Sequence, residues 1–110
     1  MISKEVFEMQ SRLCQGMSHA ARVELVHILG NGPQRVSGLA SATGLSQSSL
    51  SRHLAILRNL GLVNVHREGQ ENVYQLTNPK IVAICDLMRQ VLSEQIDHQV
   101  EVAKTSMKRT

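Results

Sequence analysis

Several residue types that often reveal a protein's chemistry are scarce in this sequence. Aromatic residues make up 2% of its 110 residues, and Trp is absent. A core must therefore be built from Leu, Ile, Val, Met and Ala, which suits helices packing on helices. The two cysteines, Cys14 and Cys85, are too few for a disulfide framework, so a reducing cytoplasm is the expected location. No apolar run approaches the length of a signal peptide or a membrane span, which predicts no membrane partner.

Motifs of the common enzyme classes are also missing. The sequence has no His-Glu-x-x-His, no glycine loop that would hold a phosphate, and no nucleophile elbow. Its few carboxylates lie towards the two ends of the chain and do not converge. We therefore expect no catalytic site and no cofactor.

Acidic side chains are absent from the middle of the chain. Between Glu24 and Glu68 there is no Asp or Glu, whereas four arginines lie in this stretch. A segment without carboxylates can approach a phosphate backbone without repulsion, which favours nucleic-acid binding. Chance in a region rich in Ser and Leu is the alternative explanation. The four arginines are Arg35, Arg52, Arg58 and Arg67.

The length is that of one domain, residues 1–110, and the patterning predicts a mainly α-helical fold with a β-hairpin wing. The expected order is helix, helix, helix, helix, strand, strand, helix, which is a winged helix-turn-helix. We expect the tail, residues 105–110, to fray. The predicted helices cover residues 3–17, 20–29, 36–42, 46–60 and 79 to about 104, and the strands cover residues 62–66 and 72–76.

The fourth predicted helix carries the features of a recognition helix. Ser46 is a good N-cap, and Leu50, Leu54 and Leu57 share one face that should pack inward. The opposite face is polar, short and free of acids, so it can lie deep in a major groove and bond to base edges or phosphates. A solvated helix on an ordinary domain, or a protein-interaction module with the same fold, are the alternatives. The predicted contacts from this helix are Gln47, Ser48, Ser49, Ser51 and Arg52.

The predicted hairpin adds two further candidates for DNA contact. Arg67 and Gln70 lie near its tip, where a basic wing would touch the DNA backbone or the minor groove beside the recognition helix.

Six segments of the sequence form a recognisable set: Ala21-Arg22, Leu45 to Leu54, Leu57-Arg58, Gly61-Leu62-Val63, Arg67-Glu68-Gly69-Gln70 and Tyr74-Gln75-Leu76. Together they resemble the ArsR/SmtB family of winged-helix repressors. The resemblance covers residues 17–92 and implies a homodimer, built by the first and last helices, that releases its operator when an inducer binds. A two-fold dimer would read a palindromic operator. Within the family motif, His53 would orient the recognition helix or touch a phosphate.

The metal sites that the resemblance implies are not present in this sequence. The Asp-x-His of the family's last helix falls on Asn78 and Lys80, and its second half falls near Val91 and Glu94. The Cys-x-Cys site of the third helix falls on residues 39–42, which contain no Cys. We therefore expect no metal. A metal- or metalloid-responsive repressor with a non-standard site is the alternative, and a solvated polar face is the plain reading of its candidates Glu94, Asp97, His98 and Glu101.

The cysteines offer a different inducing signal. Cys14 lies at the edge of the apolar stripe of the first helix and Cys85 lies within that of the last helix. If these helices pack together in a dimer, oxidation or persulfide bridging of the two thiols, within or between chains, would strain the scaffold that spaces the recognition helices. The resemblance includes thiol-based members, but their pair lies on the second and fifth helices, so Cys14 departs from that pattern. Both residues being small buried hydrophobes is the alternative.

Overall fold

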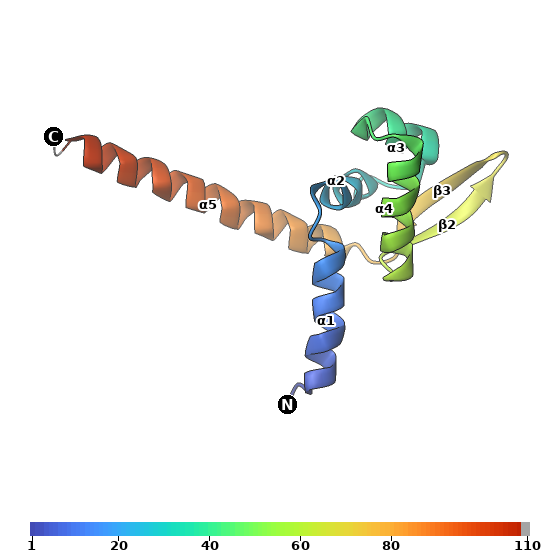
Figure 1. Cartoon of the computed structure of the whole chain (residues 1–110), viewed down its shortest axis with the longest axis horizontal. Helices are drawn as coiled ribbons and strands as arrows, with labels where there is room; N and C mark the ends of the chain where they lie inside the picture. The colour runs from blue at the N-terminus through green and yellow to red at the C-terminus, as the bar shows by residue number, and fades with distance from the viewer. Residues whose placement is uncertain (109–110) are drawn as a thin grey trace.

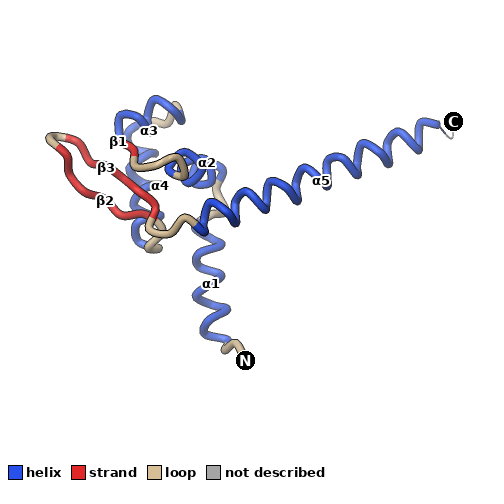
Figure 2. The backbone as a smooth tube through the Cα atoms, turned by 180° about the vertical axis from the view of Figure 1, so that it is seen from behind, coloured by secondary structure: helices blue, strands red, loops and turns tan. Residues whose placement is uncertain are grey.

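The computed structural model describes residues 1–108 and contains every helix and both wing strands that the sequence predicts (Figure 1). Figure 2 shows the same chain from behind, with the helices, strands and loops distinguished by colour. The elements are α1 (Lys4–Gly16), α2 (Ala20–Leu29), β1 (Gln34–Arg35), α3 (Val36–Thr43), α4 (Gln47–Asn59), β2 (Val63–Glu68), β3 (Glu71–Leu76) and α5 (Lys80–Lys108).

The structure differs from the prediction mainly in two places, and β2 also continues through Glu68, two residues past its predicted end. The short strand β1, which the sequence analysis missed, pairs antiparallel with β3 and places Arg35 opposite Val73. Across residues 1–108 the sheet order is therefore β1-β3-β2. Two residues after a proline are too few to show an alternating pattern. The prediction that α5 ends near residue 104 was also wrong, because the helix continues through Lys108. Residues 109 and 110 of the predicted tail lie outside the described part.

The ends of α4 are fixed by local sequence signals. The Ser46 hydroxyl accepts a hydrogen bond from the Ser49 backbone N–H, which confirms the predicted cap. At the other end Gly61 adopts a φ of 75°, which favours glycine. The Leu62 N–H then donates to the Leu57 carbonyl and the Gly61 N–H to the Arg58 carbonyl, which is the Schellman arrangement. The chain turns sharply here and enters the wing.

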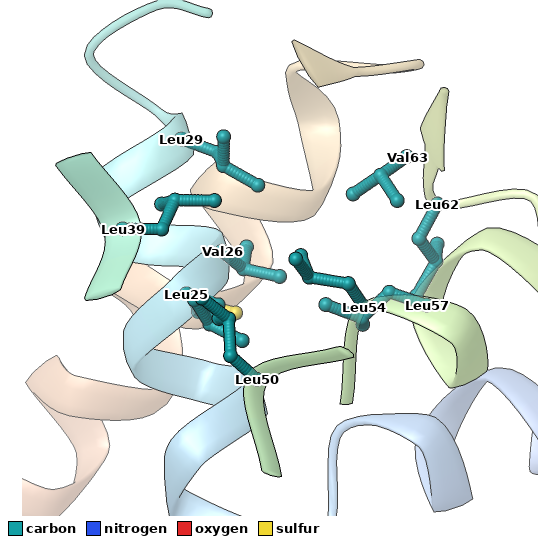
Figure 3. Close-up of a cluster of buried hydrophobic side chains, with 10 residues drawn as sticks. Leu25, Val26, Leu29, Leu39, Leu50, Leu54, Leu57, Leu62 and Val63 are labelled. Carbon is teal, nitrogen blue, oxygen red and sulfur yellow. The ribbon is translucent and has the colours of Figure 1, made fainter. Parts of the chain in front are cut away.

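One leucine-rich core joins the helix-turn-helix to the base of the wing and to the start of α5 (Figure 3). This core packs α4 against α2. The side chains are contributed by α2, α3, α4, the α4–β2 connection, the start of β2 and α5, and they are Leu25, Val26, Leu29, Leu39, Leu50, Leu54, Leu57, Leu62, Val63 and Cys85.

Helices α1 and α5 stand away from this body in different directions (Figures 1 and 2). Both carry large apolar side chains that are exposed in the single chain. None of the described helices combines the length and apolarity needed to cross a membrane. The exposed side chains on α1 include Val6, Phe7, Met9 and Leu13, and those on α5 include Ile84, Leu87, Met88, Val91, Leu92, Ile96 and Val100.

Candidate nucleic-acid interface

The outer face of α4 is polar and open to solvent. Leu50, Leu54 and Leu57 point into the core, as predicted. The side chains of Gln47, Ser48, Ser51 and Arg52 are exposed, whereas Ser49 is half-buried. The helix therefore presents hydrogen-bonding groups of short reach, with one arginine among them.

The charge on this face is positive only. Helix α4 contains no acid, and Arg52 and Arg58 are both exposed. No salt bridge joins either arginine to another residue in the described part of the chain. Both guanidinium groups are therefore available to an anionic partner such as a phosphate.

His53 lies on the opposite, inner side of α4. Its side chain is 6% exposed, and its ring lies 4.5 Å from the His19 ring, centroid to centroid. The Arg22 guanidinium donates a hydrogen bond of 3.2 Å to His53 Nδ1 and one of 2.5 Å to the Gly16 carbonyl. The expectation that His53 touches DNA is corrected by this burial. Its buried position agrees with the other role expected above, that of orienting the helix, and this role stays a prediction.

The protonation state of His53 follows from the same contacts. Arginine has no hydrogen-bond acceptor, so Nδ1 of His53 must accept, and the proton of the neutral ring lies on Nε2. Burial, followed by the charges of His19, Arg22 and Arg52, lowers the pKa of His53 below its ordinary value. The ring is therefore held neutral at the junction of α1, α2 and α4.

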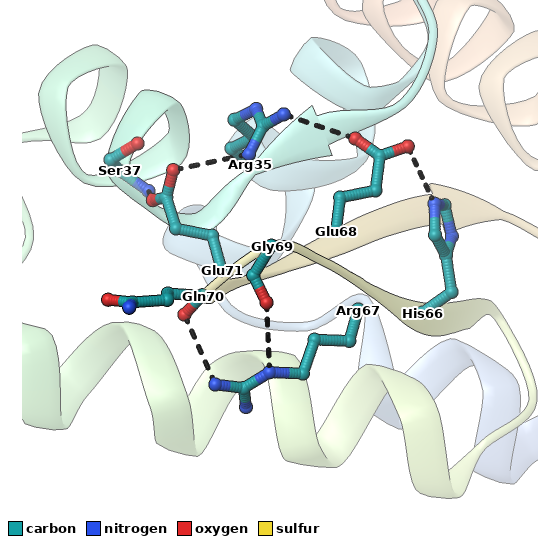
Figure 4. Close-up of polar contacts among 8 residues, drawn as sticks. All are labelled: Arg35, Ser37, His66, Arg67, Glu68, Gly69, Gln70 and Glu71. Atoms are coloured by element: carbon teal, nitrogen blue, oxygen red, sulfur yellow. Dashed lines mark hydrogen bonds and ion pairs between the residues drawn. The ribbon is translucent and has the colours of Figure 1, made fainter.

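The wing carries Arg67 close to its turn. The Arg67 Nε donates to the Gly69 carbonyl at 3.3 Å and its Nη2 to the Gln70 carbonyl at 3.5 Å, so the side chain folds over the turn (Figure 4). Gly69 has a φ of 61°, which the tight turn requires. Arg67 and Gln70 are both exposed, so they remain free to meet a ligand beside α4.

Two arginines with structural contacts were not assigned a role by the sequence analysis. Arg22 reaches His53, which lies 31 residues further along the chain, and Arg35 reaches Glu68 and Glu71 in the wing. Neither contact has a local sequence signal, because both depend on how distant elements pack.

The two thiols lie in different surroundings. Cys14 is exposed on α1, whereas Cys85 is 8% exposed and belongs to the core. Burial raises the pKa of the Cys85 thiol, which lowers its thiolate fraction and hence its reactivity. Both cysteines are free.

The candidate metal ligands on α5 are exposed and do not form a site. Within residues 1–108 no three His, Cys, Asp or Glu side chains come close enough together to hold a metal ion. This includes Glu94, Asp97, His98 and Glu101.

Comparison with known proteins agrees with the geometry of this interface. A family model described as bacterial regulatory protein, arsR family, matches residues 19–65, which span α2, the helix-turn-helix and the start of the wing. The transcriptional activator HlyU of Vibrio cholerae is 35% identical over 72% of this chain and 73% of its own length.

Solved structures of several regulators share the fold. Rv0081 of Mycobacterium tuberculosis has a TM-score of 0.79 and 27% identity, covering 89% of this chain and 99% of that one. Reduced HlyU of Vibrio cholerae has a TM-score of 0.72 and 32% identity, and the match covers 80% of this chain and 93% of that one. The transcriptional repressor BigR of Xylella fastidiosa has a TM-score of 0.70 and 28% identity, and the match covers 82% of this chain and 96% of that one. Rv0081 is named as a helix-turn-helix transcriptional regulator, HlyU as a transcriptional activator and BigR as a transcriptional repressor. With its acid-free recognition helix and its wing, the chain belongs to the arsR family of bacterial regulatory proteins.

Proposed function

We propose that this protein is a homodimeric transcriptional repressor that binds a palindromic operator and releases it when its thiols are oxidised. The acid-free outer face of α4, with Arg67 of the wing beside it, is the observation that carries the DNA-binding part. Gln47, Ser48, Ser51 and Arg52 would contact base edges and phosphates, and Arg67 and Gln70 the flanking backbone, while the half-buried Ser49 would contribute at the start of the helix. Repression is proposed because the similar protein BigR is a repressor, although HlyU is an activator.

The apolar faces of α1 and α5 support the homodimer. The chain exposes 8096 Å² of accessible surface, whereas a compact monomer of this size exposes about 6,100 Å². The excess of about 2,000 Å² is of the order that a stable dimer interface covers. Two-fold symmetry would set the recognition helices about 34 Å apart, which is one turn of DNA and the reason for a palindrome.

Selection from a pool of random duplexes tests this proposal with the full chain. We expect the selected duplexes, of about 30 base pairs, to contain two inverted half-sites about one helical turn apart. Binding should weaken steeply as the salt concentration rises, since counterions are released from the phosphates. Transcription in vitro from a promoter carrying the selected site should fall when the protein is added. A protein-interaction module would select no duplex, and this result would remove the DNA-binding proposal.

The inducing signal is proposed to be a peroxide or reactive sulfur acting on Cys14 and Cys85. Cys14 is exposed and would react first: a peroxide transfers one oxygen to its sulfur, which becomes a sulfenic acid, and water leaves. The Cys85 thiol would then attack that sulfur, forming a disulfide and releasing a second water. The burial of Cys85 in the core means that a disulfide there must disturb the packing of α5. HlyU, whose reduced form has been solved, is a similar protein.

Cysteine variants test this signal separately from DNA binding. Cys14→Ser and Cys85→Ser should both bind the selected duplex when reduced, and neither should release it after hydrogen peroxide or sodium tetrasulfide. The unaltered protein should release it and rebind after dithiothreitol, with the disulfide or bridging sulfur visible by mass spectrometry. Release by a variant that carries both substitutions, Cys14→Ser and Cys85→Ser, would overturn the thiol signal. Release by zinc or arsenite in place of peroxide would favour the metal-responsive alternative.

A further inference from the structure

We propose that Arg35 is a positioning residue for DNA binding, because it neutralises two carboxylates of the wing and helps to hold the wing against α3. This inference rests on the proposed function. It concerns the Arg35 cluster, which consists of Arg35, Ser37, Glu68 and Glu71 (Figure 4).

Arg35 bridges the two acids on either side of the wing turn. Its Nη2 lies 3.2 Å from Glu68 Oε2, and its Nη1 lies 3.5 Å from Glu71 Oε2. Glu68 also contacts His66 at 3.1 Å through its other oxygen. One planar guanidinium can bind two carboxylates at once, whereas an ammonium acts as a single point charge.

The cluster also fastens the wing to the helix-turn-helix. Arg35 is the residue before α3, and it makes no side-chain capping bond of its own. Glu71 instead accepts a hydrogen bond of 3.3 Å from the Ser37 backbone N–H in the first turn of α3. Hydrogen bonding from Ser37, first from its side chain and then from its backbone N–H, lowers the pKa of Glu71 against the opposing effect of burial, and Arg35 adds to this lowering. The wing is therefore tied to the element that precedes the recognition helix.

The pairing of the strands sorts the charges of the wing onto two faces. Glu68 lies opposite Glu71, and Arg67 lies opposite Asn72. Because neighbouring residues of a strand point to opposite faces, both acids lie on one face and Arg67 lies on the other. Arg35 lies opposite Val73, which is two residues from Glu71, so Arg35 shares the face of the acids. The acids and the basic contact residue are thus separated by the sheet itself.

The electrostatic consequence follows from counting charges at the wing tip. Arg67, Glu68 and Glu71 alone sum to one negative charge, and Arg35 brings the sum to zero. Without Arg35 the two carboxylates would lose the guanidinium that they share, and their uncompensated negative charge on a short hairpin would repel a phosphate backbone. Arg35 therefore lets a wing with two acids serve as a DNA contact.

Three variants of the full chain test this inference on the selected duplex. Arg35→Gln should weaken binding about tenfold at low salt, because it frees the carboxylates. Arg35→Gln combined with Glu68→Gln and Glu71→Gln should restore affinity to within about threefold of the unaltered protein. Arg89→Gln is the matched control, since it removes one positive charge from an exposed site on α5 and should leave binding unchanged.

A second measurement needs no DNA. Hydrogen exchange of the Ser37 amide should be faster in Arg35→Gln than in the unaltered protein, because the wing is less firmly held. Unchanged affinity of Arg35→Gln would overturn the inference. Failure of the triple variant to recover would also overturn it, because Arg35 would then be a direct DNA contact. If the unaltered protein selected no duplex, the proposed function itself would have failed, and the inference with it.

Discussion

Arg52 and His53 are neighbours in the chain, but they serve opposite sides of α4. The Arg52 side chain is exposed among the polar groups of the outer face, whereas His53 is buried against Arg22 and His19. Under the proposed function, Arg52 would contact DNA, whereas His53 would help to hold the helix that carries Arg52 in place. The two residues therefore make separable predictions, one on binding and one on stability.

Arg52→Ala should weaken binding of the selected duplex by about 1–3 kcal/mol if the guanidinium reads a base. The reason is the loss of a charge-assisted pair of hydrogen bonds in the groove. A gel-shift titration at fixed salt measures it, with Arg89→Ala as the control for loss of a positive charge. Binding equal to that of the control would remove Arg52 from the interface.

Stability should fall as the pH drops below about 6.5, the ordinary pKa of histidine. The unfolded chain protonates His53 near that value, while the folded chain, with its lowered pKa, does not. The unfolded state therefore binds more protons in this range. The free energy of unfolding falls as the pH drops from the pKa of His53 in the unfolded chain to its lower pKa in the folded chain. Urea unfolding between about pH 7.5 and about pH 5 should show a smaller loss for His53→Gln than for the unaltered protein. The exposed His27→Gln is the control, and an equal loss in both variants would contradict the role of His53.

The position of His53 could have been read from the sequence, whereas its partner could not. His53 follows Leu50 by three residues and precedes Leu57 by four, so it shares their face of the helix. The sequence analysis instead included His53 among the candidate DNA contacts, because it lies within the family motif. That Arg22 would be the donor depends on how α2 packs on α4, which no spacing within either helix reveals.

At the scale of elements, the glycines at the end of α4 and within α3 have opposite roles. Gly61 has a φ of 75°, and a Cβ there would meet no described atom within 4 Å, so its constraint is purely conformational. Gly38 lies inside the exposed part of α3, where a Cβ would meet only the Gln34 side chain at an ordinary 3.5 Å. One glycine is needed by the backbone and the other is not.

Gly61→Ala should therefore destabilise the protein by about 1–2 kcal/mol, and Gly38→Ala should stabilise it by about 0.5–1 kcal/mol. The two variants add the same methyl group, so each serves as the control for the other. Chemical denaturation at matched protein concentration measures both. Effects of the same sign would show that the Schellman end does not govern the α4–β2 connection.

The elements with strong local signals were predicted correctly, and the short one was not. Ser46, the leucine face and Gly61 define α4, and the alternation of residues 62–66 and 72–76 defines the wing. Strand β1 exists because β3 offers an edge for it to pair with, which is a tertiary cause. The Arg35 cluster depends on that pairing, and for this reason sequence reasoning could not find it.

At the scale of the whole molecule, the shape departs from that of a compact monomer. The radius of gyration is 18.0 Å, whereas about 13 Å is typical of a compact domain of this length. The extents of 65 × 42 × 22 Å reflect the two projecting helices. Helix α5 has 29 residues, about 43 Å of helix, and most of its apolar side chains have no cover from their own chain.

Met88→Glu tests whether a second copy of the chain packs on the exposed apolar side chains of α5. Met88 is 66% exposed on α5, so the substitution should not disturb the folded monomer, but in a dimer it would bury an unpaired charge. Sedimentation should show a dimer for the unaltered protein and a monomer for the variant. Gln90→Glu, which adds the same charge about 200° around the helix, should remain dimeric.

The same variant separates the role of dimerisation from that of α4. A monomer retains its recognition helix, so Met88→Glu should bind a duplex with one half-site as well as the unaltered protein does, and should lose the tighter binding to two half-sites. A variant that stayed dimeric would place the interface elsewhere than on this face of α5. A monomer with undiminished affinity for the full site would show that the two recognition helices bind independently. The spacing of the half-sites would then make no contribution to the binding free energy.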